Sequence, residues 1–183
     1  MITNYKLDKN TLVQSADGLD FTLLTKPTKE EIGRLATAHN FPFDYIAGIL
    51  DDDENARFEM DDEGNLVLLL QYSCVEDEAT EVYPFSLIIN KKKKDVILSL
   101  NHDYDLSPIF ERHYDPSRYQ HELIFQIMST LGRSFNNYLA QFKKRMKVIE
   151  KELALSQENA QIMEIIRSQK SLIYFEAALE DNI

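Results

Sequence analysis

The feature that most constrains the fold of this sequence is a long helical seam in its C-terminal half. Apolar side chains recur there at alternating spacings of three and four residues: Ile124, Met128, Leu131, Phe135, Tyr138, Phe142, Met146, Ile149 and Leu153. This pattern predicts one amphipathic helix over residues 117–155, about 57 Å long at 1.5 Å per residue. Because an ordinary globular helix has only about 11 to 12 residues, so long a helix needs partners along its length.

A second amphipathic helix supplies such a partner. Residues 156–159 can break the first helix, and the apolar positions that follow have helical spacing: Ile162, Ile165, Ile166, Ile173, Phe175 and Leu179. The two segments predict a helical hairpin, in which the second helix folds back along the first. Since neither Gly nor Pro closes the second helix before Ile183, we expect it to lead into a further segment.

The first half of the chain has a different pattern, with short β-rich runs. Strands are predicted over residues 19–24, 65–73, 81–90 and 95–100. A helix is predicted from residue 29, since Thr28 can act as its N-cap and Glu31 completes a capping box; a short second helix follows over residues 43–50. The tracts at residues 63–65 and 91–94 are typical of exposed hairpin turns.

These elements define an α+β fold: a mixed, partly antiparallel sheet with flanking helices, followed by a long helical hairpin. We expect the boundary near residue 105, with a sheet domain over residues 1–105 and the hairpin over residues 106–183. Only a short polar segment, residues 101–115, joins the two parts. They are therefore expected to be coupled rather than independent.

The charge of the chain limits its partners. At 183 residues and 44% hydrophobic, the chain can bury a core, and its formal net charge is -11. An acidic surface repels a phosphate backbone, so no nucleic acid is expected as a partner. Divalent metal ions and basic protein surfaces are the partners that this charge favours.

The N-terminus and the single cysteine give information on the compartment. Cys74 is the one cysteine, so an internal disulfide and a cysteine-based zinc cluster are excluded, and a buried, inert thiol is expected. The N-terminal residues lack the pattern of a secretory signal, and no apolar run approaches the roughly 20 residues of a membrane-spanning helix. The sequence as given predicts a soluble, cytoplasmic chain.

The densest candidate for chemistry is an acidic run. Asp51, Asp52, Asp53 and Glu54 are adjacent, and further acids follow at residues 59–63. Oxygen ligands of this kind suit Mg²⁺, which binds one or two carboxylates and keeps several waters. The run lacks the alternating ligands and central Gly of an EF-hand. Considered alone, the run is better explained as helix caps and solvated surface.

Motifs for catalysis are absent from the sequence. His102, His113 and His121 lie near several aspartates, but their spacing matches neither HExxH nor a nucleophile triad, and exposed loop histidines are the better interpretation. With only 5 Gly, the chain has no GxGxxG and no phosphate-binding loop. Lys91 to Lys94 are interpreted as a solvated turn. We therefore predict that the protein is not an enzyme, and a hydrolase built on residues 102–121 is disfavoured.

Taken in order, four segments resemble the cytoplasmic part of CorA-type magnesium transporters. They are residues 27–72, 83–100, 123–153 and 169–182, which together cover most of the chain. The helix that runs into "VIEKEL" resembles the family's helix ending in a Leu-Glu pair. "SQKSLIYFEAALEDN" is similar to the segment that opens the family's long stalk helix.

This resemblance implies a specific function. Members of the family are homopentameric channels with a cytoplasmic funnel, a stalk helix and two transmembrane helices, and they carry Mg²⁺ and other divalent cations such as Co²⁺. The family's Gly-Met-Asn sequence and both spanning segments are absent from these 183 residues. The resemblance therefore implies a soluble regulatory domain at the cytoplasmic face of the cell membrane, with a second helix that leads toward that membrane.

In the family, Mg²⁺ bound between neighbouring cytoplasmic domains holds the channel closed. Some members carry an acidic pair before the Ile-Leu that ends the second helix, where this sequence has Ala47 and Gly48. The run Asp51, Asp52, Asp53 and Glu54 lies one helical turn further on, and our hypothesis is that it binds the metal from this shifted position. The alternative function is a soluble acidic scaffold whose helical hairpin binds another protein.

Overall fold

The fold is built around one mixed sheet. The computed structural model describes residues 1–16, 20–76, 79–90, 94–155 and 159–182, and seven strands form the sheet within them. In spatial order these are β2 (Thr11–Gln14), β1 (Ile2–Asp8), β3 (Phe21–Thr25), β7 (Asp95–Leu100), β6 (Ala79–Asn90), β5 (Asn65–Glu76) and β4 (Arg57–Met60). The pair β3 and β7 is parallel, and every other pair is antiparallel. The predicted mixed sheet is confirmed.

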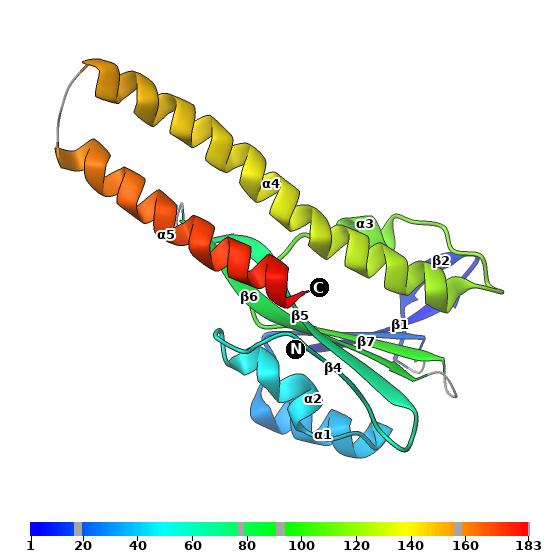
Figure 1. The fold of residues 1–183 in the computed structure, drawn as a ribbon. Coiled ribbons are helices and arrows are strands. Elements are labelled where there is room, and N and C mark those ends of the chain that lie inside the picture. The colour runs from blue at the N-terminus through cyan, green and yellow to red at the C-terminus, as the bar shows by residue number, and fades with distance from the viewer. Residues whose placement is uncertain (17–19, 77–78, 91–93, 156–158, 183) are drawn as a thin grey trace.

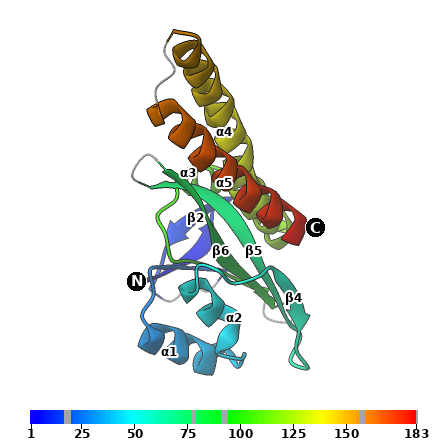
Figure 2. The same ribbon diagram turned by 60° about the vertical axis from the view of Figure 1, so that its left-hand side comes forward.

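Helices cover both faces of the sheet (Figures 1 and 2). One face carries α1 (Lys29–His39), α2 (Asp44–Ala47) and the 3₁₀ turn η1 (Gly48–Leu50). The opposite face carries α3 (Ser107–Phe110), α4 (Tyr119–Leu155) and α5 (Asn159–Asp181). The sheet is thus the middle of three layers, and apolar side chains are needed on both of its faces.

The strands supply two separate cores because successive side chains point to opposite faces. On β7, Val96 and Leu98 belong to the core under α3 and α4, whereas Ile97 belongs to the core under α1 and α2. The core under α4 also contains Leu123 and Ile127 of that helix, both fully buried. The near-continuous apolar sequences of β5 to β7 are explained by this burial on both faces.

Helix α1 begins as the sequence predicts. Thr28 accepts a hydrogen bond from the Glu31 backbone N–H at 3.2 Å, and the Thr28 backbone N–H donates to the Glu31 carboxylate at 2.9 Å. This capping box satisfies two backbone groups at the start of the helix. At the other end, Asn40 adopts the left-handed conformation that closes many helices.

The helical hairpin is also confirmed, and its first helix has two environments. The first half of α4 lies on the sheet, and its second half extends beyond the sheet with only α5 beside it (Figure 1). Phe175 of α5 packs against Phe135 and Tyr138 of α4, with ring centroids 5.2 and 4.6 Å apart. Helix α5 runs back from the tip of the hairpin, so its C-terminal end lies at the sheet again (Figure 1).

Three strands were not predicted. β1 and β2 carry polar and charged side chains at many positions, and β4 has only four residues, two of which are the exposed Phe58 and Met60. These strands form because neighbouring strands supply partners for their backbone hydrogen bonds. A local sequence pattern does not reveal such pairing. Conversely, the predicted strands at residues 65–73, 81–90 and 95–100 are confirmed, with β5 and β6 longer than expected.

The segment that joins the two parts is more structured than its polar sequence indicates. It contains α3, and Ile109 and Tyr114 within it are buried. The Tyr114 hydroxyl donates to the Ile109 carbonyl oxygen at 2.6 Å, and its backbone N–H donates to the Asn10 carbonyl oxygen at 2.7 Å. This segment therefore belongs to the core that the sheet shares with α4.

Some predictions fall on residues that the structure leaves undescribed: Leu19 at the start of a strand, Lys91–Lys93 in a turn, and residues 156–158 at the break between the long helices. The side chain of Leu153, the last position of the seam, is likewise outside the description. Of the helices in the described ranges, none combines the length and the hydropathy that crossing a membrane requires.

Candidate functional site

The acidic run connects η1 to β4 and forms a tight turn. Asp51, Asp52 and Asp53 are exposed. The Asp51 carboxylate accepts a hydrogen bond from the Asp53 backbone N–H at 3.1 Å. The backbone carbonyl oxygen of Asp51 accepts a second one from the Glu54 N–H, also at 3.1 Å. The run is therefore an ordered turn in which one carboxylate supports the backbone.

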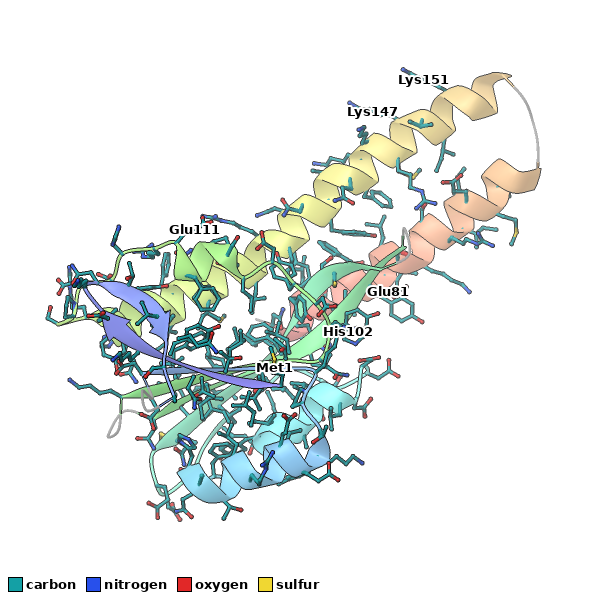
Figure 3. The ribbon with its side chains drawn as sticks, turned by 180° about the vertical axis from the view of Figure 1, so that it is seen from behind. Met1, Glu81, His102, Glu111, Lys147 and Lys151 are labelled. Atoms are coloured by element: carbon teal, nitrogen blue, oxygen red, sulfur yellow. The ribbon has the colours of Figure 1, made fainter. Side chains whose placement is uncertain are left out.

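Asp52 connects the run to the end of β7. Its carboxylate lies 3.0 Å from Nε2 of His102, and the imidazole ring of His102 stacks on Tyr83 with centroids 3.4 Å apart. The position of His102 at this end of the sheet is labelled in Figure 3. Because the ring is covered by Tyr83, the expectation that His102 is an exposed loop histidine is wrong, whereas His113 and His121 are exposed.

Glu54 occupies the place that a side chain at position 48 would need. A Cβ atom added to Gly48 would lie 2.9 Å from Leu69 Cδ2 and 3.2 Å from Glu54 Oε2. The Glu54 carboxylate is held there by Arg57, whose Nη1 donates to it at 2.7 Å. The glycine at position 48 thus makes room for a carboxylate that comes from six residues further along the chain.

The loops after the parallel strands meet at this same end of the sheet. The Lys26 backbone N–H donates to the Leu100 carbonyl oxygen at 2.9 Å, and its ammonium group lies 2.6 Å from the Asp103 carboxylate. Carboxyl ends of adjacent parallel strands are a common location for binding sites in α/β folds. Charged side chains from three separate segments are gathered here as a result.

The four acids of the run fit Mg²⁺ only partly. Asp52 faces His102 and Glu54 faces Arg57, so the carboxylates diverge. Throughout the described ranges, no three His, Cys, Asp or Glu side chains are grouped as a set able to hold a metal ion. Exposed Asp51 and Asp53 nevertheless match the one or two carboxylates, completed by water, that Mg²⁺ commonly uses. Within the described part of one chain, the carboxylates of the run therefore form no closed cage for a metal ion.

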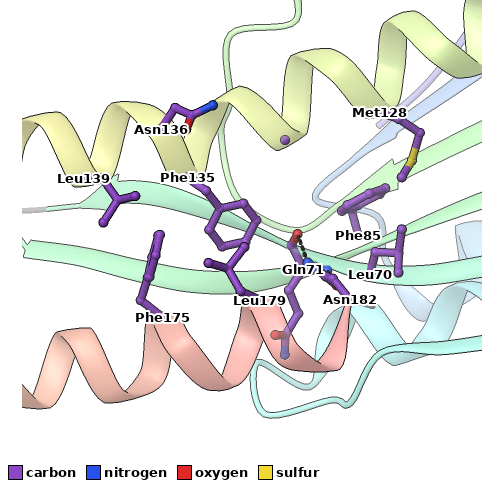
Figure 4. Close-up of a pocket in the computed structure, with 11 residues that line it drawn as sticks. Leu70, Gln71, Phe85, Met128, Phe135, Asn136, Leu139, Phe175, Leu179 and Asn182 are labelled. Carbon is purple, nitrogen blue, oxygen red and sulfur yellow. Dashed lines mark hydrogen bonds between the residues drawn. The ribbon is translucent and has the colours of Figure 1, made fainter.

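Gln71 links the acidic run to the end of the helical hairpin. Its side-chain amide Nε2 donates to the Glu54 carbonyl oxygen at 3.1 Å. Its backbone N–H donates to Oδ1 of Asn182 at 2.9 Å, and Nδ2 of Asn182 donates back to the Gln71 carbonyl oxygen at 3.1 Å (Figure 4). One residue of β5 therefore contacts both the acidic turn and the last turn of α5.

These bonds follow from the position of β5 in the sheet. Strand β4 pairs with β5 at residues 66–69, and among the described residues no other strand covers the outer edge of β5 from Gln71 to Glu76. At this edge the backbone N–H of Gln71 donates to the Asn182 side chain. The backbone N–H of Ser73 donates to the hydroxyl of Ser134 of α4 at 2.9 Å. Side chains of the hairpin thus replace a missing strand at this edge.

A pocket of about 360 Å³ lies between the hairpin and the sheet, next to Gln71 (Figure 4). Its lining is mainly apolar, with a few amides: Leu70, Gln71, Phe85, Met128, Gly132, Phe135, Asn136, Leu139, Phe175, Leu179 and Asn182. A second, more polar pocket of about 250 Å³ is lined partly by Asp103, Asp105 and Cys74. Cys74 is buried as predicted, and its thiol donates to the Asp103 carbonyl oxygen at 3.2 Å.

The sequence analysis did not single out Gln71, Asn182 or the pair of His102 and Tyr83. No local signal identifies them, because an amide in an apolar strand is a common surface residue. Their partners lie 111 residues away for Gln71 and 50 residues away for His102. Only the packing of α5 and of the acidic turn on the sheet brings these groups together.

Solved structures of metal transporters share this architecture. The complete structure of the CorA magnesium transporter from Methanocaldococcus jannaschii matches with a TM-score of 0.76 and 16% identity, over 100% of this chain and 60% of that one. The soluble domain of the same CorA matches with a TM-score of 0.79 and 16% identity, over 100% and 76%. The ZntB cytoplasmic domain from Vibrio parahaemolyticus RIMD 2210633 matches with a TM-score of 0.70 and 13% identity, over 98% and 75%. The class of the fold is that of transporter soluble domains.

The sequence agrees with that class. The model of the CorA-like Mg²⁺ transporter protein family matches residues 17–183, so the chain belongs to this family. It spans 60% of the length of the complete CorA structure. Comparison with curated proteins yields no significant match.

Proposed function

We propose that this chain is the cytoplasmic regulatory domain of a CorA-like divalent cation transporter and that it senses intracellular Mg²⁺. The observation that carries the proposal is the family match over residues 17–183, together with the soluble-domain fold. In this proposal the full-length protein is a homopentamer at the cell membrane, anchored by segments that follow residue 183. Within this chain, the sheet part (1–105) and the hairpin (106–183) are the two proposed structural units.

We place the metal at Asp51, Asp52, Asp53 and Glu54. The exposed carboxylates give a local negative field that attracts Mg²⁺ or another divalent ion such as Co²⁺. Since they do not converge within one chain, the proposed ion is held partly by water and shared with acids of a neighbouring copy. Acids on adjoining copies repel one another until a cation lies between them, so assembly becomes linked to cation concentration.

Two contacts support this placement. The Glu54 carboxylate lies beside Gly48, where some family members carry an acid, so negative charge is retained near that position. Gln71 joins the acidic turn to Asn182 at the end of α5, so a change in the turn has a direct path to the helical hairpin. Two states of the turn would be needed for the contact to act as a switch.

Titration calorimetry of the chain with Mg²⁺ tests the proposal. The variant D51N/D52N/D53N/E54Q removes the charge of the run while keeping side-chain size. A matched control, E111Q/E176Q/E180Q/D181N, removes the same charge from exposed acids elsewhere on the surface. The proposal predicts saturable binding to the chain and to the control but not to the run variant.

Sedimentation of the same three proteins, with and without Mg²⁺, completes the test. Metal-dependent association that disappears only in the run variant is the expected result. If the chain and both variants bind Mg²⁺ equally, the ion lies elsewhere; if none binds, the run is a solvated turn and this chain alone does not sense the metal. Repeating the titration with Co²⁺ measures the selectivity of the run.

One observation favours the alternative function, a scaffold that binds another protein through its hairpin. Helix α5 exposes several large apolar side chains on the face that points away from α4, among them Ile162 and Ile173. Capture of a different protein by this face, with no metal effect, would support a scaffold.

A further inference from the structure

The projecting half of α4 has a basic outer side. Lys143, Lys144, Lys147 and Lys151 are all exposed. At about 100° of rotation per residue, the four lysines fall within an arc of about 100° around the helix. Figure 3 shows Lys147 and Lys151 on the side of α4 that points away from α5. We name these four residues the α4 basic stripe.

Two other residues of α4 mark its inner side. Arg145 pairs with Glu164 of α5 at 2.7 Å, and Ile149 is buried. Each of them is about 160° from Lys147 around the helix. The stripe is therefore opposite to α5. Val148 is 49% exposed and lies directly beside the stripe.

The charge of the surrounding segment is positive. Residues 123–149 of α4 contain no Asp or Glu, and Glu150 and Glu152 follow at the end of the helix. Residues 140–170, which include the tip of the hairpin, contain seven basic residues and four acidic ones. All but four of the 31 acidic residues of the chain thus lie outside this segment. In a chain of net charge -11, the tip of the hairpin is a local reversal of charge.

The acids of the sheet part act only weakly on the stripe. Lys147 lies about 30 Å further along α4 than Ile127, which is buried on the sheet. The screening length in physiological salt is about 8 Å. Glu81 of β6 lies on the opposite side of α4 from Lys147 (Figure 3). The field at the stripe is therefore set mainly by the charges of the hairpin itself.

We propose that the α4 basic stripe docks on the surface of an anionic lipid bilayer. Clusters of Lys and Arg on an exposed helix are attracted to the phosphate-bearing headgroups of such a surface. The stripe spans about 12 Å along the helix, so its lysines can contact several headgroups at once. Val148 beside it supplies an apolar side chain that can enter the interface.

Other anionic partners fit the stripe less well. A small anion is usually held in a concave site, and neither of the two pockets described above is lined by any of these lysines. An acidic protein needs apolar area at the centre of its contact, and Val148 is the one exposed apolar residue between Lys143 and Lys151. A plane of negative charge requires neither a pocket nor such an apolar centre.

The inference rests on the proposed function for the presence of a membrane near the chain, but its test contains no Mg²⁺. All measurements are made in a chelator, with vesicles of neutral phosphatidylcholine alone or with added phosphatidylserine. Binding to the anionic vesicles by a chain that does not bind Mg²⁺ would remove the metal sensor and retain this contact. The opposite result would remove this contact and retain the sensor.

Two variants change the charge of the tip in opposite directions. K143Q/K144Q/K147Q/K151Q removes the charge of the stripe while keeping residues with good helix propensity. E150Q/E152Q removes the two acids at the end of α4. Circular dichroism and urea unfolding check that both variants fold like the parent chain.

A matched control removes four exposed cations from the sheet part. The variant is K6Q/K9N/K29Q/R34Q, which has the same net charge as the stripe variant. Asn is used at position 9 because the backbone there has a positive φ of 46°, a conformation that Asn tolerates. Any effect of net charge alone would appear equally in this control.

Co-sedimentation with vesicles over a lipid series gives the decisive measurement. We expect the parent chain and the control to bind the anionic vesicles, more weakly at high salt, and not the neutral ones. Each lysine near an anionic surface contributes about fivefold to the affinity, so the stripe variant should lose on the order of 100-fold. E150Q/E152Q should bind several-fold more tightly than the parent chain.

An environment-sensitive label tests the orientation. Cys74 is buried, so the label reacts with a cysteine introduced at an exposed position. The fluorescence of a label on V148C should shift to the blue when anionic vesicles are added. A label on T37C, at an exposed position of α1 on the other face of the sheet, should not change.

Four outcomes would overturn the inference. One is a parent chain that prefers neither kind of vesicle at about 1 mM accessible lipid. Another is equal binding by the stripe variant and the control. The third is release from the vesicles by inorganic phosphate at constant ionic strength, because this indicates a site for a single anion. The last is tighter binding to soluble polyglutamate than to the anionic vesicles, which would make the stripe a surface for acidic proteins.

Discussion

The two halves of α4 carry the same amphipathic pattern and differ in what they contact. In the half on the sheet, Leu123 and Ile127 are fully buried beneath the helix. In the half beyond the sheet, Ile149 is also buried, but Val148 is about half exposed, and the neighbouring α5 exposes Ile162. The same helix is therefore a core element at one end and one arm of a two-helix projection at the other (Figure 1).

This difference separates helix formation from helix stability. A seam of spacing three and four forms a helix in either half, but the free energy gained depends on how much apolar surface is removed from water. The sheet-bound half has a sheet and α3 as partners, whereas the projecting half has only α5. The projecting half is thus the part of the hairpin most open to binding partners and to movement.

The largest effect is expected from truncating the sheet-bound half. Ile127→Ala should lower the free energy of unfolding by about 2–5 kcal/mol, because it leaves a cavity in the core beneath α4. Val148→Ala in the projecting half should change it by less than about 0.5 kcal/mol. Urea denaturation measures both values. Equal losses in the two variants would contradict the expectation that burial on the sheet sets what a side chain of α4 contributes to stability.

The next effect concerns the point where α5 returns to the sheet. Asn182→Ala leaves the Gln71 N–H and carbonyl oxygen without their partners, which should reduce the free energy of local opening by about 1–3 kcal/mol. Hydrogen exchange at Gln71 and in the last turn of α5 is the measurement. Asn136→Ala, which alters an exposed amide lining the same pocket, is the control. Unchanged exchange at Gln71 would mean that Asn182 does not hold this edge.

A pH effect is expected at the start of the sheet-bound half. Burial raises the pKa of Tyr114 from 10.0 to about 12, and burial also raises the pKa of Tyr119. A pKa raised by folding gives stability that is fully present below the unfolded value and is lost as pH rises through the folded one. The free energy of unfolding should therefore fall between about pH 10 and 12.

Substitution of both tyrosines isolates this effect. Y114F/Y119F should be less stable at neutral pH, because the hydrogen bonds from Tyr114 to Ile109 and from Tyr119 to Lys94 are lost. Its stability should vary less with pH than that of the parent chain between pH 10 and 12. A decline as steep as in the parent chain would assign the alkaline loss to other groups.

The smallest effect is expected in the projecting half. Arg145 of α4 and Glu164 of α5 form an ion pair at 2.7 Å, with Arg145 about half exposed. Arg145→Gln should lower the free energy of unfolding by about 0.2–1 kcal/mol at low salt and by less at high salt. Unfolding in urea at two salt concentrations measures this dependence. A loss as large as that of Ile127→Ala would make the projecting half as well anchored as the sheet-bound half.

Much of the fold was predictable because its signals are local. The seam of α4 and the capping box at Thr28 and Glu31 depend on residues a few positions apart. β1 and β4 were missed because their pairing partners, not their own composition, make them strands. The short β4 illustrates this: its exposed Phe58 and Met60 read locally as part of a polar, acidic loop.

The sequence predicts where the candidate site lies in the chain but not which distant residues it contacts. The acidic run at residues 51–54 is evident from the sequence, and its role as a metal site remains a proposal. The contacts of Asp52 with His102 and of Gln71 with Asn182 join residues far apart in the chain. No periodicity or motif encodes such pairs, because they depend on how whole elements pack.

The sequence by itself determined the positions of the long helices α1, α4 and α5, the positions of most of the apolar strands, and the strong negative charge of the chain. These properties follow from side-chain spacing, capping and composition. Only the tertiary structure decided that half of α4 lies on the sheet, that Asn182 and Ser134 bind the outer edge of β5, and that apolar side chains of α5 and β4 remain exposed. The physical reason is that burial and hydrogen bonding between distant segments depend on the arrangement of elements in space, which local interactions leave open.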